Sequence, residues 1–445
     1  MNAERANLAE LCEASGTTFV LALFVDLNGK PCAKLVPVEA IEQLIDEGVG
    51  FAGYAVGAIG QEPKDPDIMA MPDATSFTPI PFVKPGLAIV HCDPWVSGKP
   101  WPFAPRVILQ EVVARAAAAG FSPYAGAEVE YFLLKRDAGG ALVPADSDDV
   151  AAQPCYDARG VTRMYDHLAS ISTAMNALGW GNYANDHEDG NGQFEQNFQY
   201  AEALTTADRV ITLRYLLNVM AHERGMIATF MPKPFSNRTG SGLHLHLSLR
   251  DASTGEPVFP AGADGTDADV DGFGLSTTAR SFVAGVLAHA TALQAVIAPT
   301  VNSYKRTGAI ASSASGATWA PKLPTYGGND RTHYVRVPDD QRIELRGGDG
   351  SANPYLAVAA AVGAGLDGIA GGAVLGDVGS GPDTPFPATL LSAVEAFEAD
   401  PVIRGVLDAA GPGVSDYFAH LKKNEFFAYH AAVSEWEIER YLTAF

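Results

Sequence analysis

Three apolar segments that carry polar side chains at every second position constrain this chain most. The first is residues 342–346, RIELR, in which charged and apolar residues alternate. Successive side chains of a β-strand point to opposite faces, so Arg342, Glu344 and Arg346 share one face. An exposed edge strand would explain this segment if it stood alone, but two other segments repeat its pattern.

The other two segments add acids and imidazoles. Residues 126–133 (GAEVEYFL) place Glu128 and Glu130 on one strand face, and residues 242–248 (GLHLHLS) place His244, His246 and Ser248 on one face. Unpaired carboxylates on buried strands are costly and need cations beside them. We therefore expect the three strands to line a cavity that holds cations and an anionic substrate.

A further acidic segment, residues 185–197 (NDHEDGNGQFEQN), completes a candidate set of metal ligands. Five carboxylates and one imidazole, without any thiolate, favour Mg²⁺ or Mn²⁺ over Zn²⁺. Two divalent ions would neutralise such a cluster. The candidate ligands are Glu128, Glu130, Glu188, Glu195, His244 and Glu344.

Several arginines lie on or between the later polar segments of the chain. Guanidinium groups beside metals that acids hold are typical of sites for a nucleotide polyphosphate and a carboxylate substrate. The chain has no GxxxxGK[ST] loop, and no GxGxxG follows a strand. The spacing favours two-metal phosphoryl transfer from ATP, with ordinary surface charges or a metal-dependent hydrolase as alternatives. The candidate arginines are Arg306, Arg331, Arg336, Arg342 and Arg346.

Charge and cysteine content exclude several classes of protein. The 445 residues carry a formal net charge of −22, which should repel nucleic acid and anionic membranes. The four cysteines have no metal-binding spacing and fit a reducing compartment. The N-terminus lacks the apolar core of a signal peptide, so we expect a cytoplasmic protein. The apolar run 356–376 is rich in Ala and Gly and predicts a helix buried in protein, not a membrane span.

The order of predicted elements indicates an α+β chain with two domains. Residues 1–97 predict a small α+β domain, a proline-containing linker follows, and residues 104–445 predict a larger catalytic domain. We expect a strand at 18–25 and a long loop at 51–75. We expect helices at 106–119, 160–179, 205–225 and 277–298, and an irregular binding segment at 302–331.

The ordered set GAEVEYFL, NDHEDGNGQFEQN, TGSGLHLHLSL, NSYKR, NDRTHYVRVP, RIELR and DGSANPYLAVAAAVGAGLDGI resembles the glutamine synthetase superfamily over nearly the whole chain. NDHEDGNGQFEQN and SGATWAP resemble the bacterial branch of γ-glutamylmethylamide synthetases (glutamate–methylamine ligases) and type III glutamate–ammonia ligases. The resemblance implies an N-terminal β-grasp domain and a catalytic half-barrel of antiparallel strands flanked by helices. It also implies homo-oligomeric rings, commonly dodecamers, with active sites between neighbouring subunits.

The resemblance implies a ligase in which glutamate takes the γ-phosphoryl group of ATP and an amine then displaces phosphate from γ-glutamyl phosphate. Two or three Mg²⁺ or Mn²⁺ ions would serve each active site. One would be held by Glu130, Glu188 and Glu195 beside the substrate, and another by Glu128, His244 and Glu344 beside the ATP phosphates. Glutamate would contact Arg306, Arg346 and Gly240, with Glu130 and His244 at its border. Arg331 and Arg336 would face the transferred phosphate, and His246, Ser248 and Arg342 would lie along the nucleotide.

Departures from the superfamily pattern concern the amine. Ammonia-using members carry an aspartate in the N-terminal domain, where this chain has Ala52, and a flap glutamate, where residues 307–316 contain no acid. Thr239 replaces the usual asparagine before GSG. A roomier, less polar cage favours a small alkylated amine, so the resemblance points to L-glutamate, methylamine and ATP as substrates. Ammonia, ethanolamine or a polyamine, and a non-catalytic ring-forming relative, remain alternatives.

The base that deprotonates the amine is open at this point. Glu188 is the nearest acid that matches the superfamily pattern, and Asp186, His187 and Tyr156 are further candidates.

Overall fold

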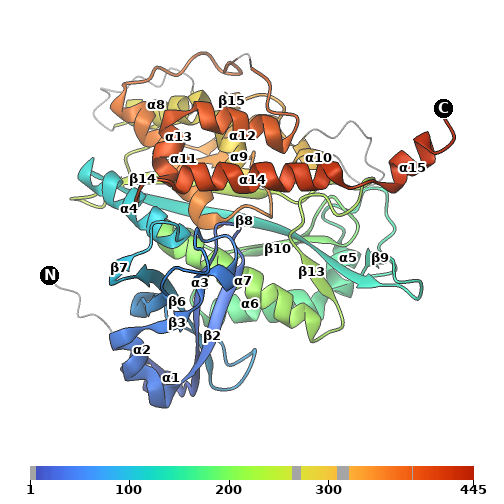
Figure 1. Cartoon of the computed structure of the whole chain (residues 1–445). Helices are drawn as coiled ribbons and strands as arrows, with labels where there is room; N and C mark the ends of the chain where they lie inside the picture. The colour runs from blue at the N-terminus through green and yellow to red at the C-terminus, as the bar shows by residue number, and fades with distance from the viewer. Residues whose placement is uncertain (1–6, 263–271, 308–319, 383) are drawn as a thin grey trace.

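The computed structural model describes residues 7–262, 272–307, 320–382 and 384–445. Two β-sheets organise these residues, and helices pack against both (Figure 1). The N-terminal sheet has the order β2-β1-β6-β4-β3, with β5 and β7 paired to β6. Its strands are β1 (Phe19–Val25), β2 (Pro31–Pro37), β3 (Val49–Phe51), β4 (Ile68–Pro72), β5 (Thr78–Pro79), β6 (Leu87–Val96) and β7 (Lys99–Pro100).

The N-terminal sheet confirms one prediction and corrects another. The strand expected at 18–25 is β1, which pairs antiparallel with β2 and parallel with β6. The long loop expected at 51–75 is wrong, because this stretch contains the short helix α3 (Gly53–Val56) and the strand β4. Ile68 and Ala70 of β4 are buried, and β4 pairs with both β3 and β6. Strand pairing over this sequence distance outweighs the turn-forming composition of the stretch.

The second sheet has the order β10-β11-β8-β14-β17-β16-β15, with β9, β12 and β13 also paired to β8. Its pairs are antiparallel except β15 with β16. The three polar-and-apolar strands expected from the sequence are neighbours in the order β8, β14, β17. The strands are β8 (Phe121–Arg136), β9 (Leu142–Pro144), β10 (Ala184–His187), β11 (Gln193–Asn197), β12 (Ala201–Glu202), β13 (Ile227–Thr229), β14 (Leu243–Asp251), β15 (Tyr326–Gly327), β16 (Val335–Asp339) and β17 (Arg342–Leu345).

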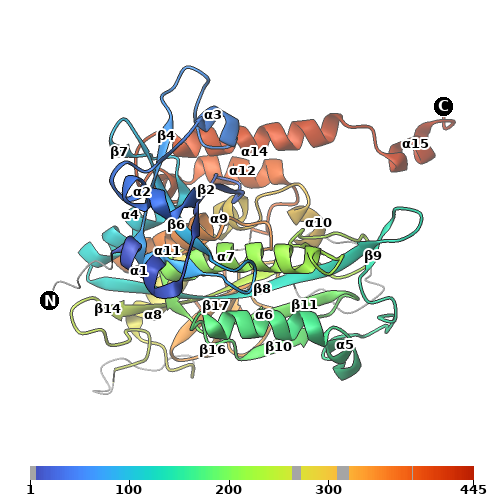
Figure 2. The same ribbon diagram turned by 90° about the horizontal axis from the view of Figure 1, so that it is seen from below.

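Helices cover this sheet on both sides. Figure 1 shows α11 to α14 on one side of β8 and α6 on the other, and Figure 2 shows α7 lying along β8. Helix α11 is the buried apolar helix expected from the sequence, and it packs against α4, α7, α8 and α13. The helices are α1 (Leu8–Ser15), α2 (Ile41–Glu47), α4 (Pro105–Ala118), α5 (Ala158–Arg163), α6 (Tyr165–Ala177), α7 (Ala203–His222), α8 (Thr277–Ala288), α9 (Ala290–Ile297), α10 (Ser303–Thr307), α11 (Pro354–Ala370), α12 (Leu390–Ala399), α13 (Pro401–Leu407), α14 (Val414–Ala431) and α15 (Glu435–Tyr441).

Two long helices expected from the sequence are each divided in two. The stretch 160–179 forms α5 and α6, and the stretch 277–298 forms α8 and α9, which meet at 74°. His289 lies at the second break, where its Nδ1 is 2.7 Å from Asp400 and its Nε2 is 3.2 Å from Asp367. These acids come from distant parts of the chain, so the local sequence around His289 does not predict the bend. Across the described residues, no single helix has the length and apolarity to cross a bilayer, although the bent pair α8 and α9 meets that test together by length and composition.

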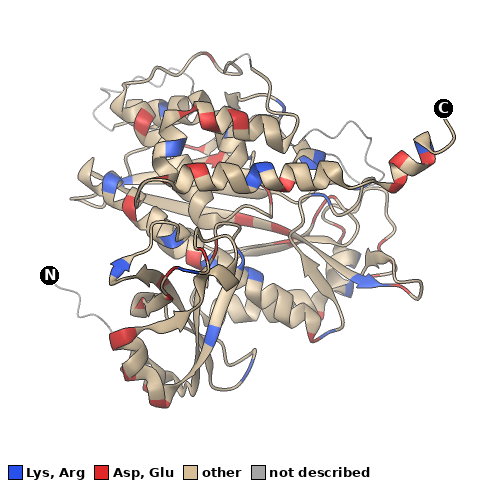
Figure 3. Cartoon of the chain, viewed as in Figure 1, with Lys and Arg blue, Asp and Glu red and all other residues tan. Residues whose placement is uncertain are grey.

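A buried arginine joins the N-terminal sheet to the second one. Arg106 of α4 pairs with Asp73, which follows β4, at 2.6 Å and with Asp93 of β6 at 2.8 Å. It also pairs with Asp208 of α7 at 3.0 Å. Figure 3 shows basic and acidic positions scattered among the helices, and acidic positions in the middle of the long strand β8. The acids inside the sheet are therefore a different feature from the mixed charges outside it.

Candidate active site

The first group of polar side chains arises where β8, β14 and β17 lie next to one another. Strand register places His244 opposite Glu128, and His246 opposite Glu344. The Nδ1 atom of His244 is 3.1 Å from Glu128 Oε2 and 3.6 Å from Glu344 Oε1. Glu128, His244 and Glu344 offer ligand atoms within 4.8 Å of one another, so they could hold one metal ion.

Two further groups extend from the first along the sheet. Glu130, Glu195 and His244 form one, and Asp186, Glu188 and Glu195 form the other, each with ligand atoms within 4.8 Å. The structure therefore divides the trio expected from the sequence, Glu130, Glu188 and Glu195, between two overlapping groups. Asp186 is an additional ligand candidate. Its position two residues before Glu188 in an extended segment is the sequence signal that identifies it.

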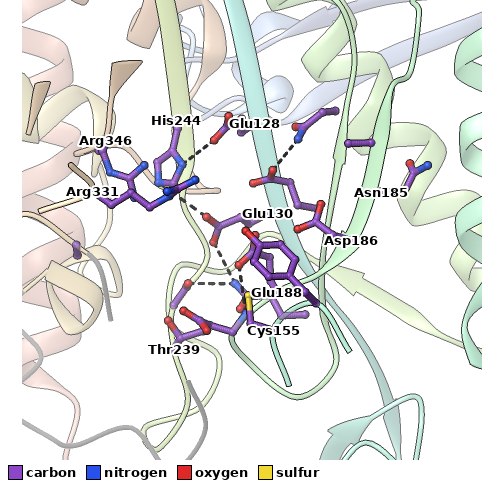
Figure 4. A pocket seen from close by; sticks show the side chains of 18 of the residues that line it. Glu128, Glu130, Cys155, Asn185, Asp186, Glu188, Thr239, His244, Arg331 and Arg346 are labelled. Atoms are coloured by element: carbon purple, nitrogen blue, oxygen red, sulfur yellow. Dashed lines mark hydrogen bonds and ion pairs between the residues drawn. The ribbon is translucent and has the colours of Figure 1, made fainter. Parts of the chain in front are cut away.

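These groups surround a cavity of about 920 Å³. Figure 4 shows Arg331 and Arg346 beside His244 on one side, Asp186 and Glu188 on the other, and Glu130 between them. The sequence-predicted residues that line it are Glu128, Glu130, Glu188, Glu195, Gly240, His244, Arg306, Arg331, Arg336 and Arg346. Glu344 lies behind the wall, fully buried.

The remaining predicted residues line a second hollow of about 440 Å³, which shares Glu128 and Tyr183 with the first. His246 and Ser248 lie here, and His246 Nε2 is 2.8 Å from Glu128 Oε1. Arg342 also lines this hollow and lies 3.4 Å from Asp339. Tyr124 and Tyr200, which the sequence pattern did not predict as site residues, add two aromatic rings.

Cations hold the carboxylates at one end of the cavity in their ionised form. Burial alone would raise the pKa of Glu128, but hydrogen bonds with His244 and His246 hold it well below the usual value. Burial likewise opposes ionisation of Glu344, yet His244 and Arg346 lower its pKa. Arg336 Nη1 also donates to Glu344 Oε2 at 2.6 Å.

The other end of the cavity has an excess of negative charge. Burial, followed by repulsion from Glu130 and Asp186, raises the pKa of Glu188 well above its usual value. Burial and repulsion from Glu128 and Glu188 do the same to Glu195. Burial also raises the pKa of Asp186, to about 6. Hard oxygen donors that repel one another fit divalent cations, whose charge would favour the ionised carboxylates.

A layer of amides orients the acidic ligands. Gln193 Nε2 donates to Glu130 Oε2 at 3.1 Å, and the backbone N–H of Gly242 donates to the same oxygen at 2.7 Å. Asn197 Nδ2 donates to Glu195 Oε1 at 2.7 Å. Gln193, Glu195 and Asn197 alternate along β11, so the period-two pattern could have identified these amides from the sequence.

Two buried arginines present unused N–H groups. Arg306 Nη1 and Arg346 Nε are buried, and neither has a hydrogen-bond partner among the described residues. A Cβ atom on Gly240 would come within 2.8 Å of Arg306 Cγ and 2.5 Å of the Pro232 carbonyl, so glycine is required for this packing. A carboxylate in the cavity would satisfy such guanidinium groups.

The four candidate bases do not all face the cavity. Glu188, Asp186 and Tyr156 line it. His187 does not, because it points to the opposite side of β10, where it is buried and lies 2.8 Å from Asp149.

Ala52 is exposed at the start of α3 and does not line this cavity. Of the acid-free flap segment 307–316, residues 308–316 lie outside the described residues.

An antiparallel sheet that gathers carboxylates, an imidazole and arginines in one cavity defines a class of enzyme that handles divalent metals and anionic substrates. Comparison with known protein families identifies the class more closely. The family profile "Glutamine synthetase, catalytic domain" matches residues 102–441. The chain therefore belongs to the glutamine synthetase family, as its motifs predicted.

Relatives of two kinds cover nearly the whole chain. A "Glutamine synthetase" of Rhizobium leguminosarum bv. phaseoli is 41% identical over 441 residues, which are 97% of this chain and 98% of that protein. A "Glutamate--methylamine ligase" of Methyloversatilis universalis is 40% identical over 441 residues, 96% of each chain. A solved structure described as "GmaS/ADP complex-Conformation 1" has a TM-score of 0.89 and 43% identity, covering 98% of this chain and 99% of that one.

Family membership establishes the reaction type. The chain is an ATP-dependent ligase, and the family uses ATP and divalent metals, binds small-molecule substrates and forms homo-oligomers. The acid and imidazole groups of the cavity fit that metal requirement.

Proposed function

We propose that this enzyme joins the γ-carboxylate of L-glutamate to methylamine, forming γ-glutamylmethylamide, ADP and phosphate through γ-glutamyl phosphate. The observation that carries the choice of amine is the absence of an acid at Ala52 and in residues 307–316. Without these acids the amine site would be less polar, and a methyl group tolerates such surroundings. The similarity to a glutamate–methylamine ligase over nearly the full length supports the same substrate.

The binding of glutamate rests on Arg306 and Arg346. Both arginines line the cavity, and each has a buried N–H group without a partner among the described residues. A substrate carboxylate would accept hydrogen bonds from them. This assignment also explains why buried guanidinium nitrogens are tolerated without a protein partner. Glu130 and His244 would border the same substrate.

Mg²⁺ or Mn²⁺ would be held by Glu128, His244 and Glu344 at one position and by Glu130, Glu188, Glu195 and Asp186 at the other. Bound there, the ions would neutralise charge on the phosphoryl oxygens. Arg331 and Arg336 would stabilise the same oxygens from the cavity wall. The second hollow, with His246, Ser248, Arg342 and two tyrosines, would receive the nucleotide.

The acid-rich end would receive the amine. Methylammonium is a cation, so the unpaired charge around Asp186 and Glu188 would attract it. Either acid would then accept a proton before the amine attacks γ-glutamyl phosphate. Tyr156 is not suited to this role, because burial raises the pKa of its hydroxyl to about 12 and keeps it protonated. The enclosed cavity would limit hydrolysis of that intermediate.

The site would be completed by a second subunit. Ala52 is exposed and lies outside its own chain's cavity, as expected if its loop faces the site of a neighbour in a ring.

We extend the proposal to an N-terminal β-grasp domain at 1–97, a catalytic domain at 104–445, dodecameric rings and a cytoplasmic location. Light scattering of the purified protein tests the ring, since a monomer with full activity would contradict it.

The amine is tested by measuring ADP release with L-glutamate and each of methylamine, ammonium, ethanolamine and a polyamine. We expect methylamine to give the highest kcat/KM. The second candidate is glutamine synthetase activity, which the Rhizobium relative favours because it is equally similar. Turnover with ammonium alone would establish that candidate and reject methylamine.

A further inference from the structure

A buried aspartate and histidine lie immediately behind the acid-rich end of the cavity. Asp149 and His187 are both buried, and their Oδ2 and Nε2 atoms are 2.8 Å apart. His187 belongs to β10 between Asp186 and Glu188, so alternation along the strand turns its ring away from the cavity while the two acids face it. Neither Asp149 nor His187 lines the cavity.

Asp149 ties together the connection between β10 and β11. Besides His187, its carboxylate accepts a hydrogen bond from Asn191 Nδ2 at 3.0 Å and one from the backbone N–H of Gly192. Glu188 lies at the start of this connection, and Glu195 follows it on β11. A single carboxylate thus fixes the turn that separates two candidate metal ligands.

His187 is held by Asp149 and in turn contacts the backbone of neighbouring residues. Its Nδ1 lies 2.8 Å from the backbone carbonyl of Glu188, and its own carbonyl accepts the N–H of Tyr156 at 2.9 Å. The ring packs on Phe194 with centroids 4.8 Å apart. Gly160 is also close to the ring, since a Cβ atom there would come within 2.6 Å of His187 Cδ2. The imidazole therefore has one position, set from several directions.

We propose that Asp149 and His187 are positioning residues, which hold Asp186 and Glu188 at the distances needed to bind a divalent cation and to receive the amine. The proposal rests on the proposed roles of Asp186 and Glu188. Groups that orient metal ligands in this way typically contribute about 10- to 100-fold to metal affinity or activity. A merely structural role would lower thermal stability without a selective effect on one metal position.

The test uses Asp149→Asn, which keeps the size of the side chain, together with His187→Gln and the double variant. We expect each single variant to weaken Mn²⁺ binding at one position by about 10- to 100-fold, measured by calorimetry on the full-length enzyme. The KM for the amine should rise while the KM for ATP stays constant. Because the two residues act through one another, the double variant should be no worse than either single one.

Two further variants make the result decisive. Gly160→Ala retains every hydrogen-bonding group but displaces the imidazole, so it should reproduce the selective Mn²⁺ loss even if Asp149→Asn folds poorly. Asp251→Asn is the matched control, since Asp251 also accepts several turn hydrogen bonds, from Ser253 and Thr254, but lies outside both hollows. It should leave Mn²⁺ affinity and kinetics unchanged.

Unchanged Mn²⁺ affinity in both Asp149→Asn and Gly160→Ala, or additive losses in the double variant, would overturn the positioning role. Failure of the proposed function is separate. If ammonium is the amine, the Mn²⁺ losses and their non-additivity persist. If Glu188→Gln leaves Mn²⁺ affinity intact while Asp149→Asn lowers it, then the assignment of Glu188 as a ligand is what fails.

Discussion

The two ends of the cavity are built from the same kind of side chain and behave in opposite ways. At the end formed by β8, β14 and β17, imidazoles and guanidinium groups lower the pKa values of Glu128 and Glu344. At the end formed by β10 and β11, burial and mutual repulsion raise the pKa values of Glu188 and Glu195. One end therefore already has counter-charges from the protein, whereas the other depends for its counter-charge on cations from solution.

The largest expected effect at the end formed by β8, β14 and β17 is that of Glu344→Gln. The substitution removes the charge that Arg336 and Arg346 share and a proposed metal ligand. We expect kcat to fall on the order of a thousand-fold, because transition-state charge stabilisation is lost at a buried site. Circular dichroism should show a retained fold. Loss of secondary structure together with activity would mean that Glu344 serves mainly the fold.

The next largest effect is expected from Arg346→Lys. A lysine ammonium is a point charge and cannot reproduce the bidentate geometry of guanidinium. The KM for glutamate should rise about 10- to 100-fold, while the KM for ATP changes little. Steady-state kinetics with each substrate varied in turn measures both. An equal rise in the KM for ATP would place Arg346 at the nucleotide instead.

Ala52→Asp should make the amine preference more ammonium-like. An added carboxylate at the proposed subunit boundary would stabilise a small, fully hydrated cation better than a methylated one. We expect the ratio of kcat/KM for ammonium to that for methylamine to rise about tenfold, which corresponds to ~1.4 kcal/mol. An unchanged ratio would show that this loop is not part of the amine site.

The smallest expected effect concerns stability against pH without metal. Asp186, Glu188 and Glu195 have raised pKa values in the folded protein, so the fold binds their protons more tightly than the unfolded chain does. Their stabilising contribution is present below the usual carboxyl pKa of about 4 and is lost as pH rises, for Asp186 through about 6. Calorimetry should therefore show different changes in Tm between pH 5 and 7 for the two forms of the protein. The Tm of the metal-free protein should rise less than that of the Mg²⁺-saturated protein, or should fall.

The end with intrinsic counter-charges was the easier one to predict from the sequence. Glu128, His244 and Glu344 lie on strands whose period-two pattern is local. The prediction was a shared cavity, and the structure adds that the three strands are neighbours in the sheet. The family motifs carried the other assignments. Burial of Glu344 between Arg336 and Arg346 depends on β16, and strand pairing of that kind is not encoded in a short window.

The acid-rich end depends on contacts that cross long stretches of sequence. Asp149 reaches His187 across 38 positions, and nothing in the segment around Asp149 marks it as different from other loop acids. The same reason explains the missed strand β4 and the bend at His289. Local periodicity predicted which face of a strand carries chemistry, whereas these positions required the assembled structure.

The sixteen-residue strand β8 has a consequence for how the enzyme is made. It pairs with β11 on one side and β14 on the other, and β14 pairs in turn with β17, more than 200 positions beyond β8. Closing such distant pairs is entropically slow. During synthesis, the edge of β14 that pairs with β17 therefore stays unpaired until residue 345 has left the ribosome. A stalled or truncated chain would expose this aggregation-prone strand edge.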